Sequence, residues 1–114
     1  MTNKTKKTVL ARKKRLLTRI LQHAFGLMGR KKLDDEGWIF IMKYTSNWHI
    51  TNLFVFQTID VLWLDANKTV LQTATIPAWK AHQKGIAETA YVIELPQETL
   101  TRSNTEVDDV IDWA

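Results

Sequence analysis

From Gly37 onward, the apolar residues follow the spacing expected of β-strands. Residues 37–42 form a short apolar run rich in β-forming side chains, and residues 48–56 alternate apolar with polar positions. Residues 59–64 and 69–76 flank a turn-forming cluster, Asp-Ala-Asn-Lys, so they predict a β-hairpin. In chain order, strands are expected at 37–42, 48–56, 59–64, 69–76, 87–95 and 107–113, with Pro77 and Pro96 ending two of them.

The first residues carry a different pattern. Residues 1–7 are polar and rich in Lys, and they lack the apolar side chains that would offset the entropy of ordering. A flexible basic tail is therefore expected over residues 1–7. Residues 8–17 fit two alternatives, the beginning of a long helix or an edge strand over residues 8–11.

A short helix is expected over residues 19–27. The hydroxyl of Thr18 can cap its first amides, and Gly26 and Gly29 suit its end. One helix followed by six or seven strands argues against a parallel α/β sheet. We expect a mainly β (α+β) fold, a small antiparallel sandwich or partly open β-barrel with one short N-terminal helix, as a single β-rich domain over residues 8–114.

Length and composition narrow the class of protein. A chain of 114 residues and 13.2 kDa has the size of one ordinary domain. It contains no cysteine, which excludes disulfides, thiolate catalysis and cysteine-based metal sites. No apolar run approaches the roughly 18 residues of a membrane span, and no signal-type apolar core follows the basic start. A soluble cytoplasmic protein is expected.

The charge of the chain is divided between its two parts. Residues 1–32 carry eleven Lys or Arg and no acid, whereas residues 33–114 carry five Lys or Arg and twelve Asp or Glu. The strongest basic run is Arg12, Lys13, Lys14 and Arg15, with Arg19, Arg30, Lys31 and Lys32 farther along. Such a run is typical either of contact with nucleic acid or another anionic surface, or of a solvated tail that complements the protein's own acidic surface. Both interpretations stay open.

Four ordered segments resemble a known family. They are residues 26–30, 59–65, 77–79 and 91–96, which read GLMGR, IDVLWLD, PAW and YVIELP. In this order and spacing they are similar to domain of unknown function 192, also called uncharacterised protein family 0127, over residues 8–113. The resemblance implies a compact, mainly β domain with a short N-terminal helix and no established activity. The chain departs from the family pattern at three places. Thr58 stands where the family usually has Pro, Gln97 and Glu98 follow the Leu-Pro pair where the family has Gly, and Asp108 stands where the family has the Gly of a Gly-Asp pair.

Asp60 is the first candidate for a site. Period-two geometry places it on the same strand face as Leu62 and Leu64. If that face is the core, the carboxylate needs a cationic partner, for which Arg30 is the candidate, or several backbone amides. The alternatives are a buried acceptor that helps to specify the fold and an acid that binds a ligand.

Two more residues of the family segments have alternative roles. Trp79, after Pro77, is expected either to anchor a crossing loop or to stack on a ligand in a binding site. Glu94 lies in a strand whose Tyr91, Ile93 and Leu95 share the opposite face, so a solvent-facing position is expected for it.

The sequence contains no catalytic constellation. The three His residues have no metal-ligand spacing, so no metal site is indicated, and no nucleophile elbow surrounds either Ser. No phosphate or dinucleotide loop is present, and no cofactor is indicated. The five Trp residues alternate with aliphatic ones, which favours a place in the core over base stacking.

Three function classes remain. The first is a non-enzymatic accessory protein that binds a peptide or protein partner along an open sheet edge. The alternative is non-specific binding of nucleic acid or an anionic surface through residues 12–15. The third is an enzyme with a small-ligand pocket at Asp60 and Trp79.

Overall fold

The computed structural model describes residues 1–17, 35–41, 49–50, 58–77, 83–84 and 88–113. These residues contain ten strands and one short helix. The strands are β1 (Thr2–Asn3), β2 (Thr8–Val9), β3 (Lys13–Leu17), β4 (Glu36–Ile41), β5 (His49–Ile50), β6 (Ile59–Leu64), β7 (Val70–Ile76), β8 (Gln83–Lys84), β9 (Tyr91–Pro96) and β10 (Ile111–Asp112), and the helix is α2 (Thr99–Ser103).

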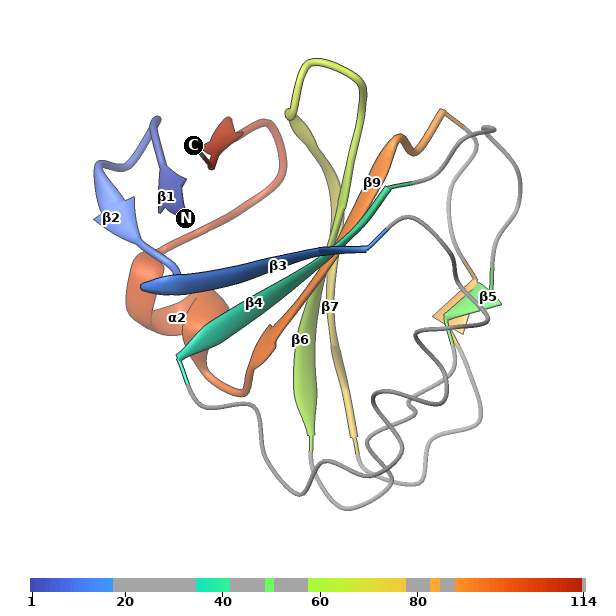
Figure 1. Cartoon of the computed structure of the whole chain (residues 1–114), viewed down its shortest axis with the longest axis horizontal. Coiled ribbons are helices and arrows are strands. Elements are labelled where there is room, and N and C mark those ends of the chain that lie inside the picture. Colours follow the sequence, from blue (N-terminus) through green and yellow to red (C-terminus); the bar gives the residue numbers. More distant parts are fainter. Residues whose placement is uncertain (18–34, 42–48, 51–57, 78–82, 85–87, 114) are drawn as a thin grey trace.

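A five-stranded sheet forms the centre of the molecule, in the order β3-β4-β9-β6-β7 (Figure 1). The strands run antiparallel except for β3, which lies parallel to β4. A three-stranded sheet, β10-β1-β2, brings the two ends of the chain together, and β5 pairs with β8. The mainly β fold class is confirmed as a sandwich-like arrangement, and the described strands do not close into a barrel.

Both faces of the central sheet are apolar. Because side chains alternate along a strand, β6 contributes to two clusters, and all six of its residues are buried. We call the first cluster the tryptophan face: Trp38, Phe40, Ile59, Val61, Trp63, Ile76 and Val92. We call the second the terminal face: Leu10, Ala11, Ile39, Leu62, Leu64, Val70, Ile93, Leu95 and Ile111. A strand buried on both faces reads as a nearly continuous apolar run, as the sequence of β6 does apart from Asp60.

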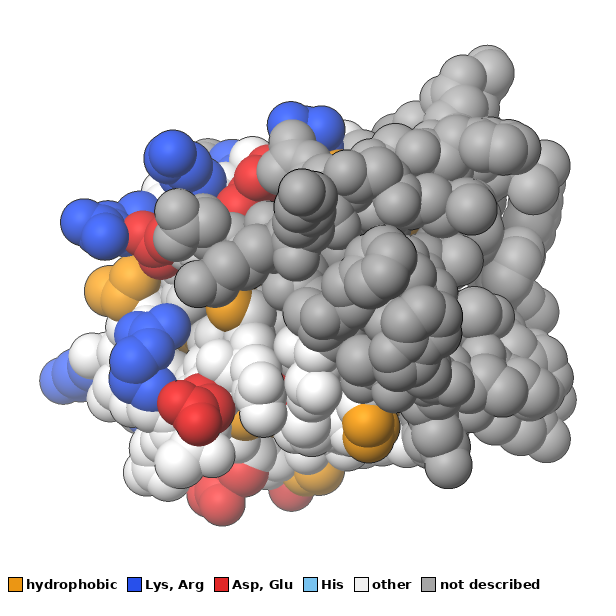
Figure 2. Space-filling model, turned by 90° about the horizontal axis from the view of Figure 1, so that it is seen from below, with side chains coloured by type: hydrophobic (Ala, Val, Ile, Leu, Met, Phe, Trp, Pro, Cys, Tyr) orange, Lys and Arg blue, Asp and Glu red, His pale blue; other side chains and the backbone are white. Residues whose placement is uncertain are grey.

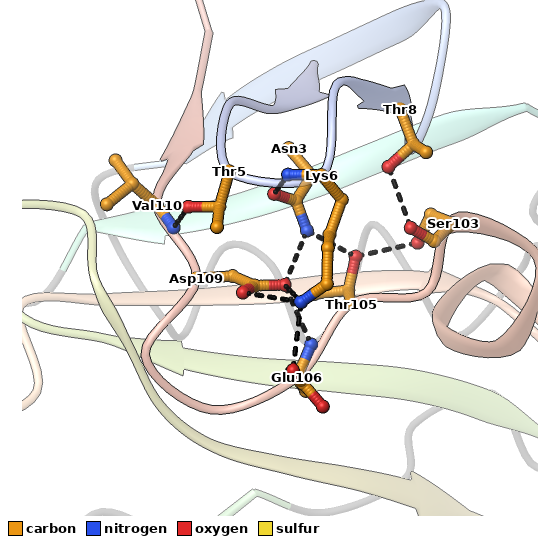
Figure 3. Close-up of polar contacts among 9 residues, drawn as sticks. All are labelled: Asn3, Thr5, Lys6, Thr8, Ser103, Thr105, Glu106, Asp109 and Val110. Atoms are coloured by element: carbon orange, nitrogen blue, oxygen red, sulfur yellow. Dashed lines mark hydrogen bonds and ion pairs between the residues drawn. The ribbon is translucent and has the colours of Figure 1, made fainter.

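The terminal face takes its name from the segments at the two chain ends that contribute to it. Polar contacts hold these segments together (Figure 3). Asn3 is fully buried, and its side-chain amide donates to Thr105 Oγ1 at 3.0 Å and to Asp109 Oδ2 at 2.8 Å. Lys6 Nζ lies 2.9 Å from Glu106 Oε1 and 3.0 Å from Asp109 Oδ1.

The prediction of a flexible tail over residues 1–7 is corrected by these contacts. The segment contributes strand β1, which pairs with both β2 and β10. Hydrogen bonds to the C-terminal loop order most of the segment, and Met1 adds an apolar contact with the terminal face. An estimate from apolar content alone failed because it did not include these hydrogen bonds.

The predicted strands are found with altered lengths. Those at 37–42, 59–64 and 69–76 correspond closely to β4, β6 and β7, and the hairpin of β6 and β7 is confirmed. Those at 87–95 and 107–113 correspond to the shorter elements β9 and β10. The expected helix at 19–27 and most of the expected strand at 48–56 lie outside the described residues.

The segment before this helix forms strands. Of the two alternatives for residues 8–17, the long helix is wrong, since β2 and β3 occupy the segment. Residues 13–17 were not expected to form a strand of the central sheet, and α2 was not expected at all. Three residues of the basic run, Lys13, Lys14 and Arg15, therefore belong to the central sheet, and Arg12 directly precedes it.

Candidate functional site

Asp60 is buried on the terminal side of β6 and is fully engaged. Its Oδ1 accepts a hydrogen bond from Thr75 Oγ1 at 2.8 Å, and its Oδ2 accepts one from the backbone N–H of Leu100 at 2.9 Å. Leu100 is in the first turn of α2, whose N-cap residue, Glu98, makes no side-chain capping bond. Asp60 thus supplies from β6 the acceptor that a helix N-terminus needs. This geometry fits the fold-specifying alternative.

Two of the predicted site residues cannot be placed beside Asp60. Arg30 and Trp79 lie outside the described residues. The pairing of Arg30 with Asp60 and the stacking role of Trp79 therefore stay predictions.

The four cations of residues 12–15 do not form one free basic patch. Arg12 is paired with Asp35, and its hydrogen bond holds the pKa of that carboxyl below its usual value. Arg15 Nε lies 3.3 Å from Glu36 Oε1, and its guanidinium stacks over the ring of Trp38 at 4.7 Å. On the face seen in Figure 2, basic and acidic side chains are interspersed across the described surface.

Lys13 and Lys14 complete the basic run. Lys13 is exposed and Lys14 is half-buried, both on strand β3. With Arg12 and Arg15 partly neutralised, the run presents less positive charge than its sequence suggests.

A groove of about 480 Å³ opens between the segment that follows β2 and the beginning of α2. Arg12 and Asp35 line one part of it, and Arg102 lines another. The guanidinium of Arg102 donates to the carbonyl oxygens of Val9 and Leu10, at 3.1 and 2.9 Å. Both arginines of the groove are already hydrogen-bonded within the chain, so the groove is poorly prepared for an anionic ligand.

The outer edge of β7 is open over the described residues. The backbone of Asp65 bonds toward the β7 side, since its N–H donates to the carbonyl of Thr69, whereas the carbonyl of Leu64 bonds toward the β9 side, since it accepts from the N–H of Ala90. Backbone groups alternate in direction along a strand, so the backbone groups of the odd-numbered residues of β6 point toward β7.

This alternation fixes which groups of β7 point outward. Val61 pairs with Ala74, so Ala74 bonds toward β6, and the amides and carbonyls of Thr73 and Thr75 point away from the sheet. No described strand pairs with β7 on that side between residues 71 and 75, and no described residue bonds to these backbone groups. β7 therefore offers a row of donors and acceptors to another strand.

Glu94 is the residue that the sequence analysis placed wrongly. It was expected to face solvent, but its exposed fraction is 3%. It lies on the tryptophan face, opposite Trp38 on β4 and Val61 on β6. Burial raises the pKa of Glu94 to about 8, and its Oε2 has no hydrogen-bond partner. The apolar Val92, two residues earlier in β9, was the available signal that this face of the strand is also core.

The described residues contain no metal-ligating cluster of three or more His, Asp or Glu side chains. In the part of the chain that the structure covers, no helix has the length and apolar character required to cross a bilayer.

Comparison with known proteins places the chain among uncharacterised relatives. The model of the family DUF192, described as an uncharacterized ACR, matches residues 2–113. A UPF0127 protein of Pyrococcus abyssi is 29% identical over 113 residues, which cover 97% of this chain and 94% of the relative. A UPF0127 protein of Thermococcus sibiricus is 30% identical over 114 residues, covering 97% and 72%.

The fold also has a solved counterpart. The crystal structure of a protein of unknown function from Novosphingobium aromaticivorans aligns with a TM-score of 0.75 at 21% identity, over 88% of this chain and 74% of that one. At this level of identity the likeness concerns the fold alone.

Proposed function

Because the chain belongs to the DUF192 family, whose function is uncharacterised, we propose a function from its own geometry: it is a non-enzymatic binding protein that takes up an extended segment of a partner along the open edge of β7. The outward backbone groups of Thr73 and Thr75 are the observation that carries this proposal. An added strand would satisfy them with main-chain hydrogen bonds, as in β-augmentation.

The side chains of β7 support the same function. Natural edge strands are commonly protected against pairing by Lys, Pro or a very short length. β7 has seven residues, VLQTATI, with neither a charge nor a Pro among them. Its one irregularity is a register shift opposite Trp63 and Leu64, which leaves the half from Gln72 to Ile76 in regular pairing with β6. Such an edge suits an uncharged partner segment rich in β-branched residues.

The experiment uses a substitution that the sheet tolerates. The N–H of Thr73 points outward, so Thr73→Pro removes an edge donor without removing a ladder bond. Extended peptides are selected from a library against the wild-type protein and then measured on both proteins. We expect Thr73→Pro to weaken their binding at least about tenfold, which corresponds to 1.4 kcal/mol. Val107→Lys, at an exposed residue outside the sheets, is the matched control and should leave binding unchanged.

Amide hydrogen exchange locates the bound peptide. Peptide binding should slow the exchange of the Thr73 and Thr75 amides, since an added strand protects them from water. Equal binding to the wild type and Thr73→Pro, or unchanged exchange at these two amides, would reject the proposal. Slowed exchange that depends on protein concentration without peptide would identify a second copy of the chain as the added strand.

A second candidate is binding of nucleic acid or another anionic surface through residues 12–15. The exposed Lys13 on the edge strand β3 supports it, whereas the pairing of Arg12 with Asp35 and of Arg15 with Glu36 weakens it. RNA and DNA affinity measured over a salt series distinguishes the candidates, because phosphate contacts make affinity fall steeply with salt. Lys13→Glu should reduce that affinity if this candidate holds, and it should leave peptide binding at β7 unchanged.

A further inference from the structure

β7 has the properties that its own edge selects in a partner strand. The edge suits an uncharged segment rich in β-branched residues, and β7 reads VLQTATI, with four β-branched residues and no charge. Thr75 is exposed and residues 71–74 are half-buried, whereas every residue of β6 is buried, so β7 lies at the surface of the central sheet. Two copies of β7 can therefore approach each other without bringing like charges together.

The regular half of β7 is self-complementary in register. It spans residues 72–76, with the register shift on one side and Pro77, which has no N–H, on the other, and its centre is Ala74. When two antiparallel copies pair about Ala74, the outward backbone groups of Thr73 lie opposite those of Thr75 in the second copy, and the reverse pair forms as well. Each pair exchanges two hydrogen bonds, so all the outward groups of Thr73 and Thr75 find partners.

The side chains agree with this register. Thr75 lies on the Asp60 side of the sheet, because its hydroxyl donates to Asp60 Oδ1 at 2.8 Å, and Thr73 lies on the same side, two residues away. Thr73 of one copy then lies beside Thr75 of the other, a favourable cross-strand pair whose hydroxyls can hydrogen-bond. Ala74 meets its own counterpart at a non-hydrogen-bonded position, where the two Cα atoms are about 4.5 Å apart and a small side chain fits.

We propose that the open edge of β7 is closed by β7 of a second copy of this chain, in an antiparallel pair centred on Ala74. The inference rests on the proposed function, because it names the strand that the β7 edge takes up. The pair joins two five-stranded central sheets into one continuous sheet of ten strands about a two-fold axis. The interface is short, so we expect a weak and reversible dimer.

Self-pairing regulates access to the β7 edge. The outward backbone groups of Thr73 and Thr75 bond either to a second copy or to a segment of another partner, so the two kinds of binding exclude each other. By mass action, the apparent affinity for another partner falls as the protein concentration rises. The dimer is the state in which the edge is protected from indiscriminate pairing.

The first measurement is the mass of the protein in solution as a function of its concentration. Sedimentation equilibrium between about 5 μM and 1 mM should show the mass rising from 13.2 kDa toward twice that value. The exchange of the Thr73 and Thr75 amides should slow over the same range, whereas that of Ala74, which already bonds to β6, should change much less. Thr73→Pro should remain monomeric, since it removes a donor from both pairs, and Val107→Lys should dimerise like the wild type.

Two charge variants test the two-fold register. In this register the two copies of residue 73 are diagonal neighbours across the interface, within reach of long side chains. Thr73→Lys and Thr73→Glu should each dimerise at least about threefold more weakly than the wild type, because like charges meet. An equimolar mixture of the two variants should form a heterodimer tighter than either homodimer, since the charges are then opposite. Misfolding of the variants cannot produce this recovery.

The outcomes separate this inference from the proposed function. A mass of 13.2 kDa at every concentration would overturn the self-pairing, and library peptides that still slow the exchange of Thr73 and Thr75 would leave the proposed function standing. A dimer that Thr73→Pro leaves intact, or a mixture of the charge variants that binds no more tightly than each alone, would assign the contact to another surface and also overturn it. A dimer that responds as expected, with no library peptide bound even at high dilution, would support the self-pairing and reject the uptake of other partners.

Discussion

Asn3 Nδ2 donates a 2.8 Å hydrogen bond to Asp109 Oδ2, and the two residues are 106 positions apart in the chain (Figure 3). The bond ties β1 to the loop that precedes β10. Hydrogen bonds from Lys6 Nζ and from the Glu106 amide converge on the same carboxylate. Polar pairing of this kind specifies one arrangement of the two chain ends, because a buried amide left unpaired costs free energy.

Asn3→Ala should destabilise the fold by about 1–3 kcal/mol, because it removes two buried hydrogen bonds and leaves Asp109 short of a donor. Urea denaturation measures the change. Thr2→Ala, at the exposed neighbouring residue in β1, is the control and should change stability by less than about 0.5 kcal/mol. Equal, small effects of both substitutions would show that the segment behaves as a tail.

The same carboxylate makes stability depend on acid. Burial alone would raise the pKa of Asp109, but the hydrogen bonds from Asn3 and Lys6 outweigh it and hold the pKa below 3.8. Its stabilising contribution is therefore present above pH 3.8 and is lost as the pH falls through the lowered value. Asp109→Asn should be less stable than the wild type at pH 6, and the gap should narrow toward pH 2. A gap that stayed constant over this range would contradict the assignment.

Glu94 makes stability depend on pH in the opposite direction. Its pKa is about 8 in the folded protein and near 4.5 when unfolded, so the folded state holds the proton more tightly. The free energy of unfolding should fall as the pH rises from about 4.5 to 8. Over this range the folded protein binds one proton more than the unfolded chain, so a rise in pH favours the unfolded chain.

Glu94→Gln removes this dependence. At pH 8 it should be more stable than the wild type by about 3–5 kcal/mol, and near pH 4 the two should be similar. Denaturation curves at several pH values provide the measurement, with Glu98→Gln expected to follow the wild type. A Glu94→Gln protein less stable than the wild type at pH 8 would indicate that the Glu94 carboxylate has a hydrogen-bond donor or a cationic partner in the folded protein.

Asp60→Ala should lower the free energy of unfolding by about 2–4 kcal/mol, since it leaves the Leu100 amide and the Thr75 hydroxyl without their acceptor. Thr75→Val removes only one of these bonds and should cost about 1 kcal/mol. Thermal unfolding combined with amide exchange in α2 checks both. Loss of Asp60 should expose the α2 amides first, and unchanged exchange there would argue against its capping role.

The sequence predicts the central strands because their signals are local. The run of β6 and the turn after it fix the hairpin, and period-two spacing gives Asp60 its buried face. The burial of Glu94 was missed because a strand with both faces covered has no polar side, and alternation then misleads. β1 and β3 were missed because contacts with residues far along the chain stabilise them. Asn3 bonds to Asp109 and Arg15 pairs with Glu36, and such contacts cannot be recognised from the pattern of neighbouring residues.

Substitutions of Gly37 test how closely the Met1 side chain packs on the central sheet. A Cβ at this position of β4 would lie 3.1 Å from Leu95 Cδ2 and in direct conflict with the end of the Met1 side chain. Met1 is flexible and only partly buried, so its thioether can move aside, whereas Leu95 is held in the terminal face. Gly37→Ala should therefore cost about 1–2 kcal/mol, and Gly37→Val more, because a branched side chain cannot avoid Leu95. Combining Gly37→Ala with Met1→Ala, made with an added initiator Met, would recover stability only if the conflict with Met1 dominates. Equal destabilisation by Gly37→Ala in both backgrounds would instead assign the cost to Leu95.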